Sequence, residues 1–188
     1  IHKLIELQNL GADVTYYSAD VTDASQMEKI FSEVKTKYGK INGIIHAAGT
    51  IDDGVILFKK KEDAANVLGP KVKGTLILNE LVQKHSSDFL ILFSSASSIL
   101  SPTGQVDYAS ANSFLDAFAQ ANYNESKTKI IALNWGQWQE VGMAARIAQS
   151  LGIVDETIHG KKSEHPLLGT IVKEGPDEFE FINNINTN

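Results

Sequence analysis

No cysteine occurs among the 188 residues of this chain. Without a thiol, the protein can form no disulfide, bind no metal through thiolates and use no cysteine nucleophile. Its five histidines, at positions 2, 46, 85, 159 and 165, never fall at the His-x-x-x-His spacing of a helical zinc site. We therefore expect no bound metal.

Long apolar runs and an excess of positive charge are also lacking. No run approaches the about 20 residues that a membrane-spanning helix requires, and no signal-peptide pattern is visible, so we expect a cytoplasmic protein without a membrane partner. The net charge of −6 argues against a nucleic-acid partner, because binding the phosphates requires basic residues. The basic run Lys59-Lys60-Lys61 is interpreted as a solvated loop.

Strand-like and helix-like stretches alternate along most of the chain. Apolar or β-prone runs predict strands at 14–17, 41–46, 89–93 and 130–134. Helical periodicity predicts helices at 1–10, from a cap at Thr22 or Asp23 to Gly39, at 62–85 with a break near Gly69-Pro70, at 105–124 and at 142–151. This alternation predicts an α/β fold with a parallel sheet and right-handed crossovers.

Polar side chains follow the apolar run at 89–93. Ser94 and Ser95 come at its end, and Tyr108 and Asn112 lie four residues apart on one face of the next helix, where open α/β sheets bind their ligands. A tyrosine, with an ordinary pKa of about 10, exchanges protons at neutral pH only if a cation or donor favours the phenolate. Lys71 is the candidate cation and Ser95 the candidate donor to a substrate oxygen. Taken singly, a packed surface tyrosine and a turn serine are the commoner interpretations.

Six short motifs occur in an order that resembles one family. They are Asp20-Val21, His46-Ala47-Ala48-Gly49, Pro70-Lys71-Val72-Lys73-Gly74, Phe93-Ser94-Ser95, Tyr108-Ala-Ser-Ala-Asn112 and Asn134-Trp135-Gly136-Gln137-Trp138. Together they resemble the ketoreductase (KR) domain of modular polyketide synthases, within the short-chain dehydrogenase/reductase superfamily.

This resemblance implies a Rossmann-like, doubly wound parallel sheet that is truncated at the N-terminus. The first strand, first helix and second strand of that fold are expected to precede Ile1, so the missing N-terminal part of the domain counts as a partner of this chain. Residues 1–152 are then the ketoreductase catalytic region. Residues 153–188 lack sustained periodicity and are interpreted as a linker or the start of a following domain.

One departure from the superfamily pattern supports this subgroup. Simple members have Tyr-x-x-x-Lys, whereas Asn112 stands at the fourth position after Tyr108 and the lysine is supplied by Lys71 in a Pro-Lys-Val context. The resemblance implies that Tyr108 protonates the forming alkoxide and Ser95 hydrogen-bonds the carbonyl oxygen. Lys71 lowers the pKa of Tyr108 and holds the nicotinamide ribose, and Asn112 completes the polar network.

The resemblance also implies NADPH as cofactor. Asp20 and Val21 are expected beside the adenine, the 46–49 motif in the cofactor cleft, and the backbone after Asn134 facing the nicotinamide. The full cofactor-binding set is Asp20, Val21, His46, Ala47, Ala48, Gly49, Lys71, Ser94, Tyr108, Asn134, Trp135 and Gly136. Taken alone, Ala47-Ala48-Gly49 is more typical of a plain strand-to-loop turn than of a cofactor site. The Gly-rich pyrophosphate fingerprint and a basic residue for the 2′-phosphate are absent from this sequence, so NADPH and NADH are not distinguished by its residues.

Ile51-Asp52-Asp53 resembles the Leu-Asp-Asp signature of B-type ketoreductases, which form a D-configured hydroxyl, and makes Asp53 a stereocontrol candidate. The expected function is NADPH-dependent reduction of a β-ketoacyl thioester, on an acyl carrier protein, to the β-hydroxyacyl thioester, alongside neighbouring polyketide synthase domains. Two alternatives stay open. One is a stand-alone short-chain dehydrogenase for a free alcohol or ketone, against which Asn112 counts. The other is a redox-silent structural domain, which has no need of Lys71, Ser95, Tyr108 and Asn112 together.

Overall fold

The computed structural model describes residues 2–123, 127–136, 161–162, 170–174 and 179–182. The chain forms two compact units, Ile1–Gly136 and Gln137–Asn188, which are described separately. Within the described residues, no helix combines the length and apolar character needed to cross a membrane.

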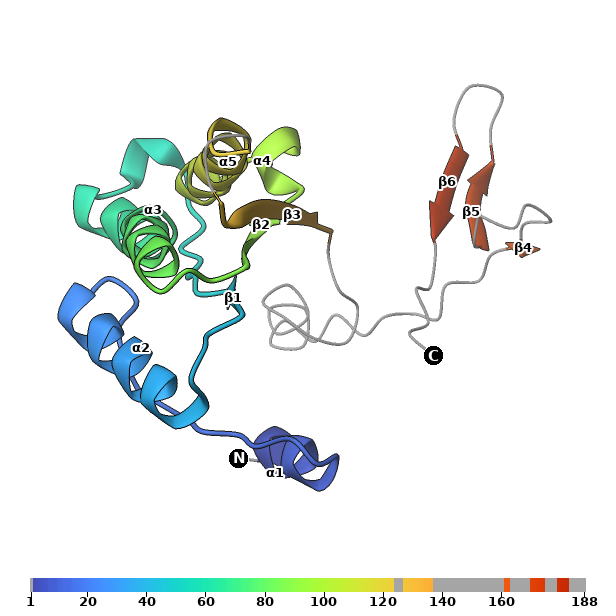
Figure 1. Cartoon of the computed structure of the whole chain (residues 1–188). Coiled ribbons are helices and arrows are strands. Elements are labelled where there is room, and N and C mark those ends of the chain that lie inside the picture. The colour runs from blue at the N-terminus through green and yellow to red at the C-terminus, as the bar shows by residue number, and fades with distance from the viewer. Residues whose placement is uncertain (1, 124–126, 137–160, 163–169, 175–178, 183–188) are drawn as a thin grey trace. The chain divides into compact units, whose positions relative to one another are not determined.

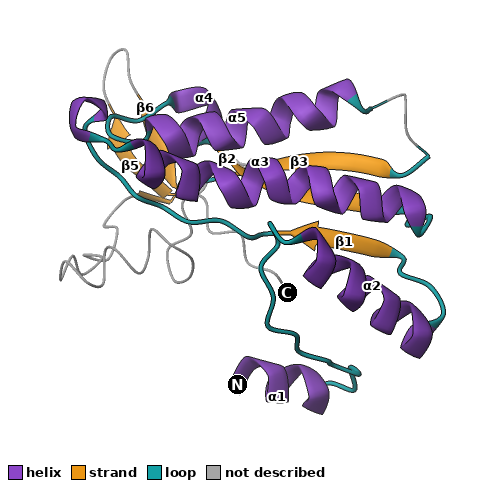
Figure 2. Ribbon diagram, turned by 90° about the vertical axis from the view of Figure 1, so that its left-hand side faces the viewer, coloured by secondary structure: helices purple, strands orange, loops and turns teal. Residues whose placement is uncertain are grey.

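The first unit contains a parallel sheet with the strand order β1-β2-β3 (Figure 1). Its strands are β1 (Gly43–His46), β2 (Phe89–Ser95) and β3 (Lys129–Trp135), and its helices are α1 (His2–Asn9), α2 (Ala24–Tyr38), α3 (Lys61–Lys84), α4 (Ser97–Leu100) and α5 (Val106–Ala121), with a 3-10 turn at Ile56–Phe58. The crossovers β1-α3-β2 and β2-α5-β3 step in the same direction, so connections of one hand place both helices on the same face of the sheet. Figure 2 shows α3 and α5 side by side along the strands. The α/β class with a parallel sheet is therefore confirmed.

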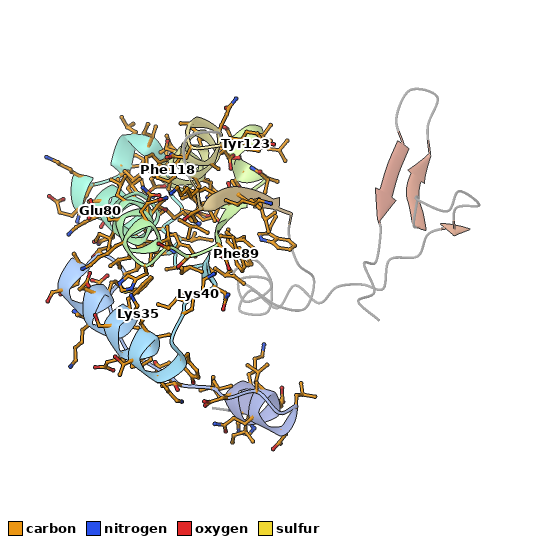
Figure 3. The ribbon with its side chains drawn as sticks, in the orientation of Figure 1. Lys35, Lys40, Glu80, Phe89, Phe118 and Tyr123 are labelled. Atoms are coloured by element: carbon orange, nitrogen blue, oxygen red, sulfur yellow. The ribbon has the colours of Figure 1, made fainter. Side chains whose placement is uncertain are left out.

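The core lies between the sheet and these two helices (Figure 3). Leu90 and Leu92 alternate along β2 and are fully buried against Val82 of α3 and Leu115 of α5, which are themselves fully buried. Burying an aliphatic side chain of this size contributes about 1.5–3 kcal/mol. The packing positions the carboxyl ends of the strands next to the first turn of α5.

The predicted caps of α2 are confirmed. Asp23 accepts hydrogen bonds from the backbone N–H groups of Ser25 and Gln26, which have no partner inside the helix. Gly39 ends the helix with a φ of 80°, a backbone conformation that residues other than glycine rarely adopt. These local signals therefore set both ends of the helix.

The strand predicted at 14–17 is wrong. This segment has no regular secondary structure, and Tyr16 is 73% exposed. Within the described residues β1 pairs only with β2, so no ladder is available to the backbone groups of this segment. β-propensity becomes a strand only where a neighbouring strand completes the hydrogen bonds.

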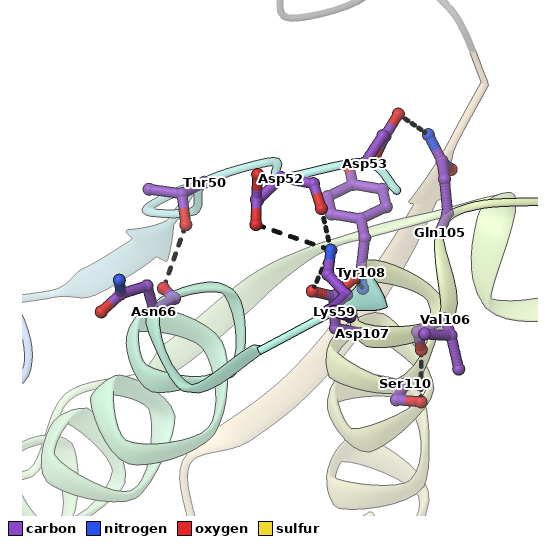
Figure 4. Close-up of polar contacts among 10 residues, drawn as sticks. All are labelled: Thr50, Asp52, Asp53, Lys59, Asn66, Gln105, Val106, Asp107, Tyr108 and Ser110. Atoms are coloured by element: carbon purple, nitrogen blue, oxygen red, sulfur yellow. Dashed lines mark hydrogen bonds and ion pairs between the residues drawn. The ribbon is translucent and has the colours of Figure 1, made fainter. Parts of the chain in front are cut away.

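The break predicted in α3 near Gly69-Pro70 is also wrong, because the helix continues through Pro70. Proline has no N–H to offer the carbonyl of Asn66, four residues earlier. That carbonyl instead accepts a hydrogen bond from the Thr50 hydroxyl at 3.0 Å (Figure 4). A side chain from the segment after β1 therefore replaces the missing helical donor.

The Ser/Pro/Gly stretch between β2 and α5 contains the short helix α4. The predicted helix at 142–151 lies outside the described residues. In the second unit, β4 (Lys161–Lys162), β5 (Thr170–Glu174) and β6 (Phe179–Ile182) form an antiparallel sheet in sequence order. The boundary at residues 152 and 153 stays a prediction.

Replacing Thr50 by valine should lower the free energy of unfolding by about 0.5–1.5 kcal/mol, because the Asn66 carbonyl loses its donor. In a Pro70→Ala background the same replacement should cost less, since alanine supplies the helical N–H. Urea unfolding of the two single variants and the double variant measures this coupling. Equal costs in both backgrounds would show that Thr50 does not substitute for the helical donor.

Candidate active site

A buried lysine and a buried tyrosine meet at the carboxyl edge of the sheet. Lys71 projects from α3, Tyr108 lies in the first turn of α5, and they are 4% and 9% exposed. The Lys71 Nζ lies 6.0 Å from the centre of the Tyr108 ring. It donates a hydrogen bond of 2.8 Å to the Phe93 carbonyl of β2. Two residues that are distant in the sequence are therefore neighbours, as the resemblance implied, while their catalytic roles stay predictions.

Glycines allow the surrounding elements to approach α3. A Cβ added at Gly49 would lie 3.1 Å from the Lys71 Cε, so the small residue after β1 leaves room for the lysine side chain. A Cβ added at Gly74 would lie 3.0 Å from the nearest Val21 methyl carbon and 3.5 Å from the His46 ring. Gly49, expected in the cofactor cleft, thus makes room for the Lys71 side chain.

The Lys71 ammonium is held in a poorly solvated position. Burial lowers the pKa of Lys71 to about 8, against the opposing effect of the Asp116 carboxylate, which favours the charged form. At pH 7 the amine is therefore still mostly protonated. A cation in this position favours a negative charge on nearby oxygen atoms.

His46, the last residue of β1, is also buried, at 3% exposure. Burial, followed by the charge of Lys71, lowers the pKa of His46 to about 4, although the Pro70 carbonyl opposes the shift. The ring is thus neutral at pH 7, and its Nε2 lies 3.1 Å from the Pro70 carbonyl oxygen. In the tautomer with hydrogen on Nε2, the ring donates to that oxygen and links β1 to α3 beside Lys71.

Asn112 is fully buried one turn after Tyr108. Its side-chain Nδ2 donates to the Tyr108 backbone carbonyl at 2.7 Å. Its backbone carbonyl accepts from the Ser94 hydroxyl at 3.3 Å. Its Oδ1 has no hydrogen-bond partner among the described residues. A buried acceptor without a partner is uncommon in folded proteins and fits a site that receives a donor from a water or a ligand.

Ser95 ends β2 at the same edge of the sheet. Its Oγ accepts a hydrogen bond of 3.1 Å from the backbone N–H of Ser97, at the start of α4. A serine hydroxyl that accepts through a lone pair keeps its own hydrogen for another acceptor. The hydroxyl can therefore still donate to a substrate oxygen.

The predicted cofactor residues lie around the same edge. Asp20 is exposed, and its Oδ1 accepts from the backbone N–H and the hydroxyl of Thr22, each at 2.8 Å, which lowers the pKa of the carboxyl. Ala47 and Ala48 are exposed after β1. No atom of the described residues lies within 4 Å of a Cβ added at Gly136, while the Trp135 ring packs 5.3 Å from that of Phe93, centre to centre.

A cavity of about 670 Å³ lies between the Asp20–Thr22 turn, residues 50–52 and α3. Its size is within the range of small-molecule sites, about 300–1,000 Å³. A cavity of this size, bordered by Asp20, can hold part of a nicotinamide dinucleotide. Among the described residues, no group of three histidine, aspartate or glutamate side chains could hold a metal ion.

The sequence interpretation missed Asp116. Its Oδ2 accepts hydrogen bonds from the Ser98 hydroxyl at 2.6 Å and the Asn134 Nδ2 at 2.8 Å. The Asn134 Nδ2 also lies 3.4 Å from the Ser95 carbonyl oxygen. Asp116 follows Asn112 by four residues, so the helical spacing that linked Tyr108 to Asn112 could have revealed it.

The interpretation of Lys59 as part of a solvated loop is wrong. Its side chain is only 6% exposed and forms an ion pair of 2.7 Å with Asp107 Oδ2, whose side chain is 2% exposed. Lys60 and Lys61 are exposed, as expected. No local pattern distinguishes Lys59 from its neighbours, because its partner lies far along the sequence.

Comparisons with known proteins agree with these observations. The model of the KR domain family matches residues 1–140. Polyketide synthase PksN of Bacillus subtilis (strain 168) is 39% identical over 163 residues, which are 81% of this chain and 3% of PksN. PksL of the same organism is 40% identical over 146 residues, 75% of this chain and 3% of PksL. The chain thus spans a small part of these curated relatives.

Solved structures show the same similarity. A ketoreductase domain from the bacillaene assembly line is 40% identical with a TM-score of 0.70, covering 80% of this chain and 39% of that one. An N-terminal ketoreductase from the macrolactin assembly line is 37% identical with a TM-score of 0.69, covering 73% of this chain and 28% of that one. The chain therefore spans well under half of each solved protein.

The depressed pKa of His46 makes stability depend on pH. Below about pH 6.5 the His46 ring is protonated in the unfolded chain, whereas in the native protein it is protonated only below about pH 4. The free energy of unfolding should therefore fall by roughly 3 kcal/mol as the pH drops through this window. His46→Asn should remove this component. Urea unfolding of both proteins between pH 7.5 and 4.5 tests it, and parallel pH dependences would contradict the assignment.

Proposed function

Because this chain belongs to the KR domain family of polyketide synthases, whose members reduce β-ketoacyl intermediates, we propose that it forms the catalytic edge of an NADPH-dependent ketoreductase. The proposed substrate is a β-ketoacyl thioester on an acyl carrier protein, and the product is the β-hydroxyacyl thioester. The observation that carries this proposal is the buried Lys71 ammonium beside the Tyr108 ring.

The proposed partners follow from the relatives. Those are long polyketide synthases of which this chain spans 3%, so neighbouring synthase domains and a carrier-bound substrate are expected. The chain also spans 39% of the bacillaene ketoreductase. We therefore propose that the complete domain, with further residues of the same fold, is the unit that binds cofactor.

Tyr108 is the proposed general acid. When bound, the nicotinamide supplies a hydride to the ketone carbon, and negative charge develops on the carbonyl oxygen. The Tyr108 hydroxyl donates its proton to that oxygen, and the nearby Lys71 cation stabilises the phenolate that remains. With a pKa of about 8, Lys71 carries the required charge at pH 7.

The other polar groups orient this pair. Lys71 donates one of its three N–H hydrogens to the Phe93 carbonyl, so two remain for a ribose hydroxyl and a water. Ser95, whose oxygen is held by the Ser97 N–H, donates to the substrate oxygen. The free Oδ1 of Asn112 accepts from a water or ligand that completes the network. Pre-positioned donors of this kind stabilise the charge that develops on oxygen.

The cofactor is proposed to bind along the edge formed by the ends of β1, β2 and β3. Asp20 and Val21 border the adenine end, and residues 46–49, Ser94 and residues 134–136 border the remainder. No described basic residue marks a site for the 2′-phosphate. The choice of NADPH over NADH therefore rests on the family. Asp53, whose carboxylate accepts from the Gln105 Nε2 at 2.8 Å, is proposed to direct a B-type, D-configured product.

Replacing Tyr108 by phenylalanine in the complete domain should lower kcat for a small β-ketoacyl thioester by at least about 100-fold, the usual contribution of a general acid. NADPH affinity should stay nearly unchanged, because the ring remains. Cofactor oxidation measured by absorbance and binding measured by fluorescence titration give the two values.

Tyr123→Phe is the matched control, since Tyr123 follows the same helix and is 78% exposed (Figure 3). It should keep full activity. Undiminished turnover by the Tyr108 variant would reject the assignment of the acid. An inactive parent domain that binds no NADPH would instead favour the redox-silent alternative.

A further inference from the structure

The segment that carries Asp53 is tied to the segment that carries Tyr108 by three polar contacts, and Figure 4 shows the two between side chains. The Gly54 N–H donates to the Gly104 carbonyl at 2.9 Å, the Gln105 Nε2 donates to Asp53 Oδ2 at 2.8 Å, and Lys59 Nζ pairs with Asp107 Oδ2 at 2.7 Å. All three join residues 53–59, here called the aspartate loop, to residues 104–107. The loop is thus attached to the first turn of α5.

Apolar packing does little to hold the aspartate loop. Its middle is a 3-10 turn of large apolar residues, but Ile56, Leu57 and Phe58 are 67%, 81% and 79% exposed. Side chains that remain exposed contribute little burial energy, since that energy scales with the area removed from water. The position of the loop therefore depends mainly on its polar contacts.

Of the two side-chain contacts, the Lys59 ion pair is the buried one. The side chains of Lys59 and Asp107 are 6% and 2% exposed, whereas the contact of Gln105 with Asp53 lies at the surface. Lys59 Nζ also donates to the Asp52 carbonyl oxygen and lies 3.7 Å from Asp52 Oδ2. Water competes less with a buried ion pair, so Lys59 restrains the loop more than the surface contact does.

The partner of Lys59 also contacts the backbone of the proposed acid. Asp107 Oδ1 accepts the Tyr108 N–H at 2.9 Å. That N–H belongs to the first turn of α5, where no carbonyl of the helix can accept it, and Gln105 at the helix start provides no side-chain cap. A continuous set of contacts therefore leads from Asp52 through Lys59 and Asp107 to Tyr108.

We propose that Lys59 is a positioning residue that fixes the aspartate loop relative to Tyr108 and thereby determines which face of the substrate ketone meets the hydride. This inference rests on the proposed ketoreductase function. Lys59 touches none of the reacting groups. A loop held in one place lets the rest of the substrate lie in one orientation relative to the Tyr108 hydroxyl, whereas a released loop admits the reversed orientation.

The test compares Lys59→Met, which keeps the length of the side chain but removes its charge, with Lys60→Met at an exposed neighbouring position. In the complete domain, Lys59→Met should lower kcat/KM about tenfold, mainly by raising KM, because a displaced aspartate loop no longer orients the substrate. The minor enantiomer of the hydroxy thioester, measured by chiral chromatography, should increase at least about tenfold as the contacts that discriminate the two orientations weaken. Lys60→Met should change neither value.

Asp107→Asn separates positioning from stability. It keeps an oxygen for the Tyr108 N–H, and in the double variant with Lys59→Met no unpaired charge remains buried, so thermal stability should recover toward that of the parent. Enantiomeric purity should stay low, because the loop is still released. Recovery of both stability and purity in the double variant would overturn the positioning role.

The outcomes distinguish the two proposals. A parent domain that fails to reduce the β-ketoacyl thioester overturns the proposed function, and this inference with it. An active parent whose Lys59→Met variant matches Lys60→Met in KM and enantiomeric purity overturns the inference alone.

Discussion

The structure depends on keeping an ammonium group charged where little water reaches it. Burial of Lys71 disfavours its protonated form, and the Phe93 carbonyl and the Asp116 carboxylate offset part of that cost. The lysine reaches this position only because α3 runs unbroken through Pro70 and because Gly49 carries no side chain that would collide with it. The backbone around the lysine is thus arranged for the side chain as much as for any ligand.

A second set of contacts holds the carboxyl edge of the sheet together. Asp116 on α5 binds Ser98 of α4 and Asn134 of β3, and Asn134 reaches the Ser95 carbonyl of β2. Charge-assisted hydrogen bonds of this kind restrict side-chain geometry more than neutral ones. The same carboxylate therefore supports the charge of Lys71 and joins the elements around Ser95.

The proposed chemistry and the proposed selectivity use different parts of this site. Proton transfer needs Tyr108 and Lys71, which come from the two helices that cover one face of the sheet. Selectivity needs the aspartate loop, which is largely exposed and is attached through the Lys59 ion pair. A rigid edge with an attached loop lets the loop vary while the acid stays in place, as is common where binding residues lie on loops.

The sequence by itself determined the features that depend on local spacing. The alternation of elements predicted the parallel sheet, Asp23 and Gly39 predicted the ends of α2, and a four-residue interval placed Tyr108 and Asn112 on one face. Only the tertiary structure decided features whose partners lie far along the chain. Residues 14–17 have no neighbouring strand among the described residues, and Thr50 replaces the donor that Pro70 removes. Asp107 pairs with Lys59, whose side chain is buried, while Lys60 and Lys61 stay exposed. Backbone periodicity is a property of a few consecutive residues, whereas a ladder, a substitute donor or an ion pair exists only once folding brings distant residues together.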